Sequence, residues 1–129
     1  MDFSFSEEQR QIRDSIEKLC RPFDDQYWLD RDTDGRFPED FCSALAKDGW
    51  LGIAMPEDIG GSGLGISEAA VMVQTISASG AANGGVSSIS IPLFGVNPIN
   101  IYGTEEQKQR MLPPVLRRCY AATISPALQ

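Results

Sequence analysis

The segment VSSISIPLFGVNPINIY, residues 86–102, is uncharged and carries apolar residues on every side of a helix. It belongs to a longer stretch, residues 59–104, in which Glu68 is the single charged residue. A membrane span needs about 20 predominantly apolar residues, and Gly, Pro and Asn interrupt each apolar run here before that length. The pattern therefore predicts a buried helical segment at the centre of the protein, bent by Pro92 and ended by Gly103.

Charged helices are expected on both sides of this segment, because a capping box flanks it at each side. In SEEQ (residues 6–9) and TEEQ (residues 104–107), the first side chain caps a helix and the fourth reaches back to the cap. Apolar residues recur at helical spacing after the first box, and Pro22 should end that helix. Pro113-Pro114 is expected to stop the helix that follows the second box.

Further helices are expected after Pro38 and after a cap at Ser67, and residues 24–32 are also compatible with a helix. After Arg118 the sequence CYAATI, residues 119–124, is typical of the start of a strand. The fold class is therefore predicted as all-α, a bundle-like domain of five to six helices with a strand-like stub at the C-terminus.

Length and composition limit the function. The chain has 129 residues, enough for one hydrophobic core, and a net charge of −7 that makes nucleic-acid binding improbable. It contains no His, which excludes Ser-His and Cys-His nucleophiles. Its three cysteines show no Cys-x-x-Cys spacing, so neither a disulfide framework nor a zinc site is expected, and a reducing compartment fits best.

Two clusters that resemble functional motifs have simpler explanations. The glycines of GGSGLG, residues 60–65, lack the third glycine of a dinucleotide fingerprint and the Lys of a P-loop, which favours a tight loop between helices. The paired carboxylates of the first half of the chain lie in polar, turn-rich contexts, where solvated surface is the ordinary expectation. Glu68 is expected at the start of a helix, where it interacts with the helix dipole. No catalytic residue and no metal ligand is predicted.

The central segment leaves two hypotheses open. Ser87, Ser88 and Ser90 alternate there with larger apolar side chains, including Ile91 and Phe94. Small residues on a central helix leave room for a ligand, but close packing between helices uses small residues for the same reason. From the residues alone, helix packing is favoured over a ligand groove.

Six short strings together resemble the N-terminal helical domain of the acyl-CoA dehydrogenase family. Their order and spacing match over about 120 residues, and the combination is more specific than any single string. The strings are FSFSEEQ (3–9), FPED (37–40), GWLGI (49–53), PEDIGGSG (56–63), GTEEQK (103–108) and LP (112–113).

The resemblance implies a flavoenzyme that binds FAD and oxidises an acyl-CoA thioester at its α and β carbons. In the family a glutamate removes the α-proton, a hydride passes to the flavin, and an electron-transfer flavoprotein takes up the electrons. The family has a helical N-terminal domain, a middle β-domain and a C-terminal helical bundle. The resemblance therefore implies that residues 1–118 form the first domain and residues 119–129 a truncated start of the second.

Site residues follow from the same resemblance. Ser90, Ile91 and Phe94, with Ser87 nearby, correspond to the wall of the acyl pocket, and the bulk of Ile91 and Phe94 would shorten that pocket. Tyr120 and Thr123 would form the first edge of the FAD site, although Ile124-Ser125-Pro126 departs from the family's usual sequence there.

Because most of the FAD site and the catalytic glutamate are missing, these 129 residues alone are expected to be inactive. A homo-oligomer in the cytoplasm is expected, with the mitochondrial matrix as the alternative compartment. Two alternatives to the dehydrogenase remain: a stand-alone helical binding or assembly module, and part of a flavin-dependent oxidase or monooxygenase relative.

Overall fold

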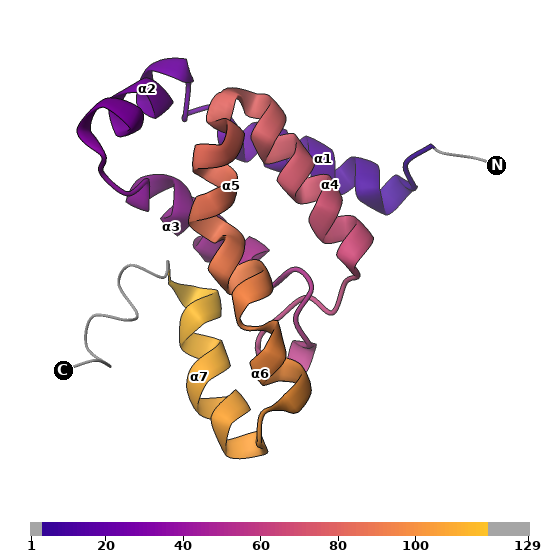
Figure 1. Ribbon diagram of the computed structural model, residues 1–129. Helices are drawn as coiled ribbons and strands as arrows, with labels where there is room; N and C mark the ends of the chain where they lie inside the picture. The colour runs from indigo at the N-terminus through magenta and orange to yellow at the C-terminus, as the bar shows by residue number, and fades with distance from the viewer. Residues whose placement is uncertain (1–3, 119–129) are drawn as a thin grey trace.

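The computed structural model describes residues 4–118, and these residues form helices and no strand (Figure 1). The all-α prediction is thus confirmed, while the strand-like stub lies outside the described residues. The helices are α1 (Glu7–Cys20), α2 (Asp25–Asp34), α3 (Glu39–Lys47), α4 (Ile66–Ile76), α5 (Ala82–Ser90), α6 (Asn97–Tyr102) and α7 (Glu105–Arg117). Short 3₁₀ turns, η1 (Trp50–Gly52) and η2 (Glu57–Ile59), follow α3, and π-helical turns, η3 (Ser77–Ala81) and η4 (Ile91–Gly95), flank α5.

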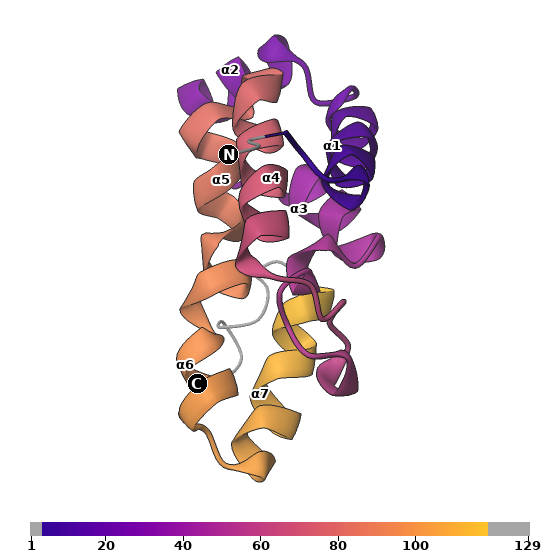
Figure 2. The same cartoon turned by 90° about the vertical axis from the view of Figure 1, so that its right-hand side faces the viewer.

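The segment from α5 through η4 to α6 is one bent helical unit, so the described chain has six helical units, within the predicted number. α1 packs along α4, and α5 turns back from the end of α4 toward the middle of the molecule (Figure 1). The view in Figure 2 shows α6 and α7 paired at the opposite end. None of the helices within residues 4–118 is long and apolar enough to cross a bilayer.

Both predicted capping boxes are present. The amide of Gln9 donates to Ser6 Oγ at 3.1 Å, and the amide of Ser6 donates to the Gln9 side chain at 3.1 Å. Thr104 and Gln107 form the same pair of bonds at the start of α7, at 3.2 and 2.9 Å. These reciprocal bonds satisfy amides that have no partner within the helix, and they explain where α1 and α7 begin.

The helical body, which we define as α1 to α5, holds the larger core. Its centre is an aromatic cluster in which neighbouring rings meet edge to face with centroids 5.0–5.3 Å apart. Gly85 brings α5 close to this cluster, because a Cβ at that position would lie 3.3 Å from Trp28 and 3.2 Å from Ile76. The aromatic residues are Phe23, Tyr27, Trp28 and Phe41.

The glycine-rich loop doubles back on the segment that follows α3. The amides of Ser62, Gly63 and Leu64 donate to the carbonyls of Gly52, Met55 and Ile53 at 2.8–3.0 Å. Gly61 has no room for a side chain, because a Cβ would collide with the Met55 carbonyl. The prediction of a tight loop joining helices is therefore confirmed, and close backbone approach is the reason for its glycines.

The α6–α7 arm, defined as these two helices, has a smaller core of its own. Met55 and Ile59 from the loop and Val96 from the end of η4 pack against Leu112, Val115 and Leu116. The prediction that Pro113-Pro114 ends the last helix is wrong, because α7 continues to Arg117. Continuing past the prolines buries Val115 and Leu116, which compensates for the amide hydrogen bonds that the prolines cannot make.

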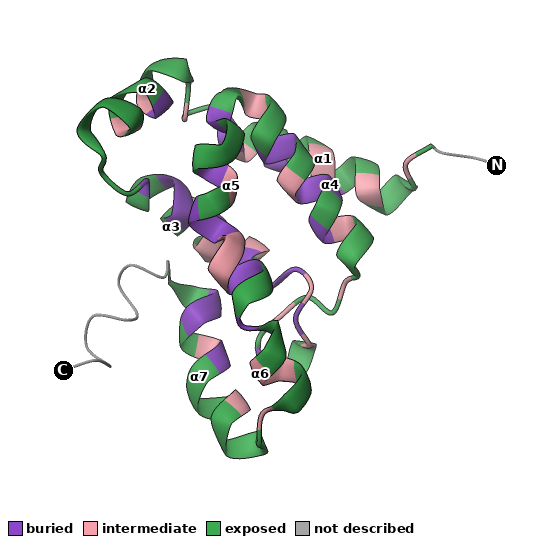
Figure 3. Ribbon diagram, viewed as in Figure 1, coloured by how far each residue is buried: buried purple, intermediate pink, exposed green. Residues whose placement is uncertain are grey.

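The prediction of a fully buried segment over residues 86–102 is correct for one side only. Ser88 and Ile89 of α5 and Leu93 of η4 are buried, and Figure 3 shows purple, buried patches along α5. On the other side, Phe94 is 44% exposed, Ile101 57% and Tyr102 85%. A helix with apolar residues on every side is therefore buried on one side only here, because no described element covers the second side.

Candidate functional site

The side chains of Ser87, Ser90, Ile91 and Phe94 lie on the uncovered side of α5 and η4, and we call them the exposed stripe. Their spacing of three or four residues places them on one face of a helix. Ser90 and Ile91 are partly exposed, while Ser87 and Phe94 are exposed. The structure thus brings together all four residues that the resemblance assigned to a pocket wall.

The serine hydroxyls of the exposed stripe are bonded to their own helix. Ser87 Oγ donates to the Gly84 carbonyl at 3.2 Å, and Ser90 Oγ donates to the Ser87 carbonyl at 2.9 Å. Each hydroxyl has one hydrogen, so what remains free on these side chains is oxygen lone pairs. The exposed stripe therefore offers a molecule packed on it small side chains and few hydrogen-bond donors.

The turn η4 is held in place by contacts on its buried side. Pro92 has no amide hydrogen, so the Ser88 carbonyl one turn earlier lacks its usual helical donor. The thiol of Cys42 donates to that carbonyl at 3.9 Å, and burial raises the pKa of this thiol to about 11. Pro92 and Leu93 are both buried, which fixes the position from which Phe94 projects.

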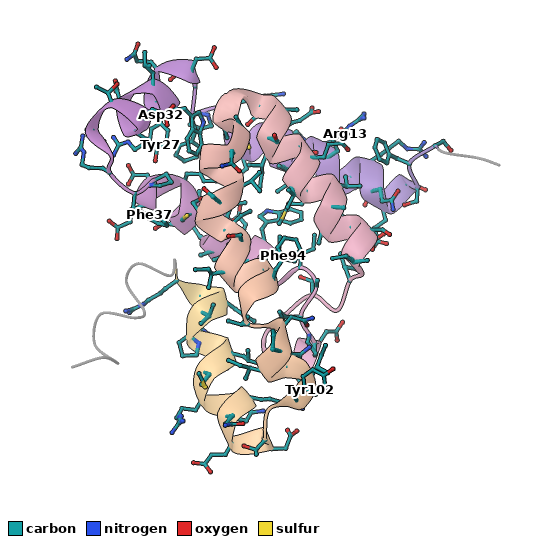
Figure 4. All side chains as sticks on the ribbon, viewed as in Figure 1. Arg13, Tyr27, Asp32, Phe37, Phe94 and Tyr102 are labelled. Carbon is teal, nitrogen blue, oxygen red and sulfur yellow. The ribbon has the colours of Figure 1, made fainter. Side chains whose placement is uncertain are left out.

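The exposed apolar surface continues beyond the predicted residues. Figure 4 labels Phe94 and Tyr102, which lie along the segment that runs from η4 to the end of α6. Ile101 and Tyr102 follow Phe94 by seven and eight residues, the helical spacing that continues the same face. This spacing of apolar residues can be seen in the sequence. It was not interpreted as an exposed face because the whole of residues 86–102 was predicted to be buried.

An open depression of about 460 Å³ lies between α4 and α5, and its lining was not predicted either. Val86 on α5 borders it, but none of the four residues of the exposed stripe does. Two other openings, one larger at about 610 Å³ and one smaller at about 370 Å³, lie along α1 and are lined largely by polar and charged residues. The residues around the depression between α4 and α5 are Val73, Gln74, Ser77, Ala78, Asn83 and Val86.

The carboxylates of the first half of the chain serve local structure. Asp24 caps α2 by accepting the Tyr27 amide at 3.0 Å, and Asp30 accepts from the Gln26 side chain at 2.8 Å. Asp34 pairs with Arg36 at 2.6 Å, and hydrogen bonds from the Arg36 backbone and side chain lower the pKa of this carboxyl. All three carboxylates are exposed, so the expectation of solvated surface is confirmed for them.

Glu68 lies in the first turn of α4, as expected, but Ser67 does not cap that helix. Gly65 holds the cap position, and its amide donates to Glu68 Oε2 at 3.0 Å. The Gln9 side chain donates to Glu68 Oε1 at 3.1 Å and is the main cause of the lowered pKa of this carboxyl. Glu68 therefore joins α1 to the start of α4, which is a structural role.

Within residues 4–118, no three His, Cys, Asp or Glu residues gather closely enough to hold a metal ion. Tyr120 and Thr123, the predicted edge of a flavin site, lie outside the described residues. The described surface therefore leaves the exposed stripe as the candidate site, a largely apolar face of one helical segment.

Comparison with known proteins identifies the family. The model of the acyl-CoA dehydrogenase N-terminal domain matches residues 6–118. The chain belongs to this family. The resemblance drawn from the six short strings is thereby confirmed.

Relatives of the acyl-CoA dehydrogenase domain are much longer than this chain. The isobutyryl-CoA dehydrogenase of Dictyostelium discoideum is 30% identical over 86% of this chain and 26% of its own length. The isovaleryl-CoA dehydrogenase of Pongo abelii is 32% identical over 93% of this chain and 29% of its own. The chain thus spans less than a third of these relatives.

A solved structure shows the same fold. One of its chains superposes with a TM-score of 0.79 and 28% identity, covering 92% of this chain and 31% of that one. The structure is described as the electron transferring flavoprotein of Acidaminococcus fermentans, with a bearing on flavin-based electron bifurcation.

Proposed function

We propose that this chain is the N-terminal portion of an FAD-dependent acyl-CoA dehydrogenase, with residues 1–118 as its helical first domain. The single observation that carries the proposal is the family match over residues 6–118. The relatives act on isobutyryl-CoA and isovaleryl-CoA, as their names state, and they extend well beyond the length of this chain. The reaction proposed is oxidation of an acyl-CoA thioester at its α and β carbons.

The share of this domain in the reaction is to form one wall of the acyl pocket. The exposed stripe suits that role, because its hydroxyl hydrogens are engaged within the helix and its larger members are apolar. Packing against such a wall removes acyl carbons from water and restricts their orientation. No described side chain is assigned as the base, and we propose that this residue lies in a part of the enzyme that corresponds to the length of the relatives which this chain does not span.

FAD is the cofactor proposed for the complete enzyme, and it would accept the hydride that leaves the β carbon. Tyr120 and Thr123 are proposed to border it. An electron-transfer flavoprotein is the proposed electron acceptor, in keeping with the flavoprotein structure that contains a chain of the same fold. A cytoplasmic homo-oligomer is the proposed state of the complete enzyme.

The proposal is tested by an acyl-CoA-dependent dye-reduction assay of the protein encoded by the complete reading frame. The 129-residue chain is assayed beside it at equal molar concentration. Dye reduction by the complete protein and none by the short chain is the expected result. Turnover by the short chain would contradict the division of roles between its domains, and no turnover by the complete protein with any acyl-CoA would contradict the proposed function.

A further inference from the structure

In three places of the sequence an Asn or Asp directly precedes a Gly: Asp34-Gly35, Asp48-Gly49 and Asn83-Gly84. In such a dipeptide the backbone nitrogen of the glycine can attack the side-chain carbonyl carbon of the preceding residue, because glycine has no side chain to obstruct the approach. The cyclic imide that forms is opened by water to an aspartyl or an isoaspartyl residue. The reaction needs a side chain that can turn and a glycine amide that is not engaged, so the fold determines which dipeptide reacts.

Both Asp-Gly pairs are held at the ends of helices. The Gly35 amide donates to the Arg31 carbonyl at 2.9 Å, and the Gly49 amide donates to the Ala46 carbonyl at 3.1 Å. These bonds close the last turns of α2 and α3. They also engage the nitrogen that would have to attack, so both pairs are protected in the folded chain.

The Asp34 side chain is held as well. The Arg36 amide donates to Asp34 Oδ1 at 2.8 Å, and the Arg36 guanidinium donates to Oδ2 at 2.6 Å. These bonds from the backbone and side chain of Arg36 lower the pKa of the carboxyl, which keeps it ionised. An ionised carboxylate is a poor target for a nitrogen nucleophile, because it has no good leaving group.

The dipeptide Asn83-Gly84 lies in a different setting, at the start of α5. Gly80 and Ala82 have φ angles of 100° and 43°, which break the helical path from α4, and no side chain among the described residues caps α5. The amides of the first helical turn, including that of Gly84, have no acceptor within α5. Both Asn83 and Gly84 are exposed, so water reaches them.

The Asn83 side chain is not restrained by hydrogen bonds. It borders the open depression between α4 and α5, and within residues 4–118 its amide group takes part in no hydrogen bond. Its carbonyl carbon can therefore turn toward the Gly84 nitrogen when the first turn of α5 opens. Glycine is a poor helix former, and the two successive glycines at positions 84 and 85 make that opening easier.

We propose that Asn83-Gly84 is a site of spontaneous covalent modification, at which Asn83 is converted to aspartate and isoaspartate. The Gly84 nitrogen forms a bond to Asn83 Cγ, the bond from Cγ to Nδ2 breaks, and the side-chain nitrogen leaves as ammonia with the proton of the Gly84 amide. Water then cleaves the ring. Cleavage between Cγ and the ring nitrogen gives aspartate, and cleavage between the backbone carbonyl carbon and that nitrogen gives isoaspartate. No electrons are transferred, and water is the co-reactant.

The two products should affect α5 in opposite ways. Aspartate adds a negative charge to the first turn of α5, where the helix dipole favours it. Isoaspartate carries the backbone through its side-chain carbon and so adds one carbon to the chain just before the second glycine. Gly85 cannot shift to absorb that atom, because a Cβ there would already lie 3.2 and 3.3 Å from Ile76 and Trp28. Isoaspartate should therefore loosen the start of α5.

The test incubates the folded 129-residue chain at mildly alkaline pH and maps its peptides by mass spectrometry. Isoaspartate is quantified with a protein isoaspartate methyltransferase, which transfers a methyl group to that residue. The expected result is conversion of Asn83 to both products, with Asp34 and Asp48 unchanged. In the chain unfolded in guanidinium chloride all three dipeptides should react, because the helix ends no longer hold the two Asp-Gly pairs.

Gly84→Ala is the matched variant, because a Cβ at that position makes an ordinary 3.8 Å contact with Trp28 and leaves the fold intact. Its new side chain obstructs the attack, so the folded variant should lose the isoaspartate signal. Asn83→Gln should lose it too, since its longer side chain would have to close a larger ring. In thermal unfolding, Asn83→Asp should have a midpoint equal to or above that of the native chain, and the isolated isoaspartyl fraction a lower one.

Two results would overturn the proposal. One is an unmodified Asn83 in the folded chain under conditions in which the unfolded chain reacts there, since the start of α5 would then protect it. The other is isoaspartate in the folded chain at Asp34 or Asp48 in amounts equal to those at position 83. An isoaspartyl fraction that unfolds at the same temperature as the native chain would contradict the predicted effect on α5.

Discussion

The helical body and the α6–α7 arm differ in how completely they cover their apolar residues. In the body, Phe41, Leu45 and Met72 have no exposed surface, and the two helices that carry them, α3 and α4, both pack against α1 and α5. In the arm, α6 has no buried residue and Tyr102 is 85% exposed. The seven large hydrophobic residues that the described chain exposes include four between Phe94 and Met111.

This difference indicates which part folds by its own packing and which part needs something more. The core of the body is extensive, so it supplies most of the stability of the chain. The arm buries one small cluster and leaves an apolar face open, a pattern typical of surfaces that are covered by another part of a protein. The remaining domains of the proposed larger enzyme would cover that face. The part of each relative that this chain does not match is more than twice as long as the chain itself.

The largest expected effect is on the core of the body. Leu45→Ala should lower the free energy of unfolding by about 2–5 kcal/mol, because it leaves a cavity at a fully buried site. Leu112→Ala in the arm should lower the free energy of unfolding by less, because the smaller cluster around it can close more of the cavity that the substitution leaves. Urea unfolding followed by circular dichroism measures both values.

Leu29→Ala is the control for these two variants, because Leu29 is 57% exposed, and its effect should stay within about 0.5 kcal/mol. An equal or greater cost for Leu112→Ala than for Leu45→Ala would contradict the assignment of stability to the body.

The second expected effect concerns the close approach of α5 to the body. Gly85→Val should lower the free energy of unfolding by about 1–3 kcal/mol, because its Cβ would collide with the Ala81 side chain at 2.6 Å and its side chain would push against Trp28 and Ile76. Gly84→Ala is the matched change one residue earlier, where the new Cβ would make an ordinary 3.8 Å contact with Trp28. It should be neutral or stabilising by up to about 1 kcal/mol, since alanine favours a helix. Equal destabilisation by both variants in thermal unfolding would show that α5 packs differently.

A smaller effect is expected on the open face of the arm. The double variant Ile101→Ser, Tyr102→Ser should reduce the fluorescence of bound ANS several-fold in the 129-residue chain and change its unfolding free energy by about 0.5 kcal/mol or less. Ile66→Ser tests an isolated apolar residue of the body that is 67% exposed, and it should leave the dye signal almost unchanged. A dye signal that depends on Ile66 more than on the arm would contradict the comparison.

The smallest effect is a pH dependence at Glu68. The folded state lowers the pKa of this carboxyl, mainly through the hydrogen bond from Gln9, so folding favours the ionised form. The resulting stabilisation is present above the ordinary carboxyl pKa and is lost as the pH falls through the lowered one. Urea unfolding at neutral and acidic pH should therefore show a smaller acid-induced loss in Glu68→Gln and in Gln9→Ala than in the native chain. The same acid-induced loss in all three proteins would contradict this role.

The features predicted correctly from the sequence depend on neighbouring residues. Both capping boxes involve side chains three residues apart. The tight glycine loop was predicted for a similar reason. Residues 60–65 lack the third glycine of a dinucleotide fingerprint and the Lys of a P-loop, and both can be checked from neighbouring residues. Such contacts form whatever the rest of the protein does.

The features predicted wrongly depend on contacts between distant parts of the chain. Pro113-Pro114 favours a helix end locally, yet burial of Val115 and Leu116 against Met55 and Ile59 outweighs that preference. Burial of one side of residues 86–102 depends on α3 and α4, which sequence spacing does not reveal. The four residues of the exposed stripe could be located from the family resemblance, but their role as a pocket wall remains a prediction.

Sequencing the coding message past the codon for Gln129 shows whether residues 1–118 are the first domain of a longer dehydrogenase. We predict an in-frame continuation into a strand-rich region followed by a helical bundle that carries a glutamate suited to remove the α-proton. That result would make residues 1–118 the first domain of a dehydrogenase. A stop codon directly after Gln129 would contradict the account, and the chain would then be studied as a helical binding module whose arm meets another protein.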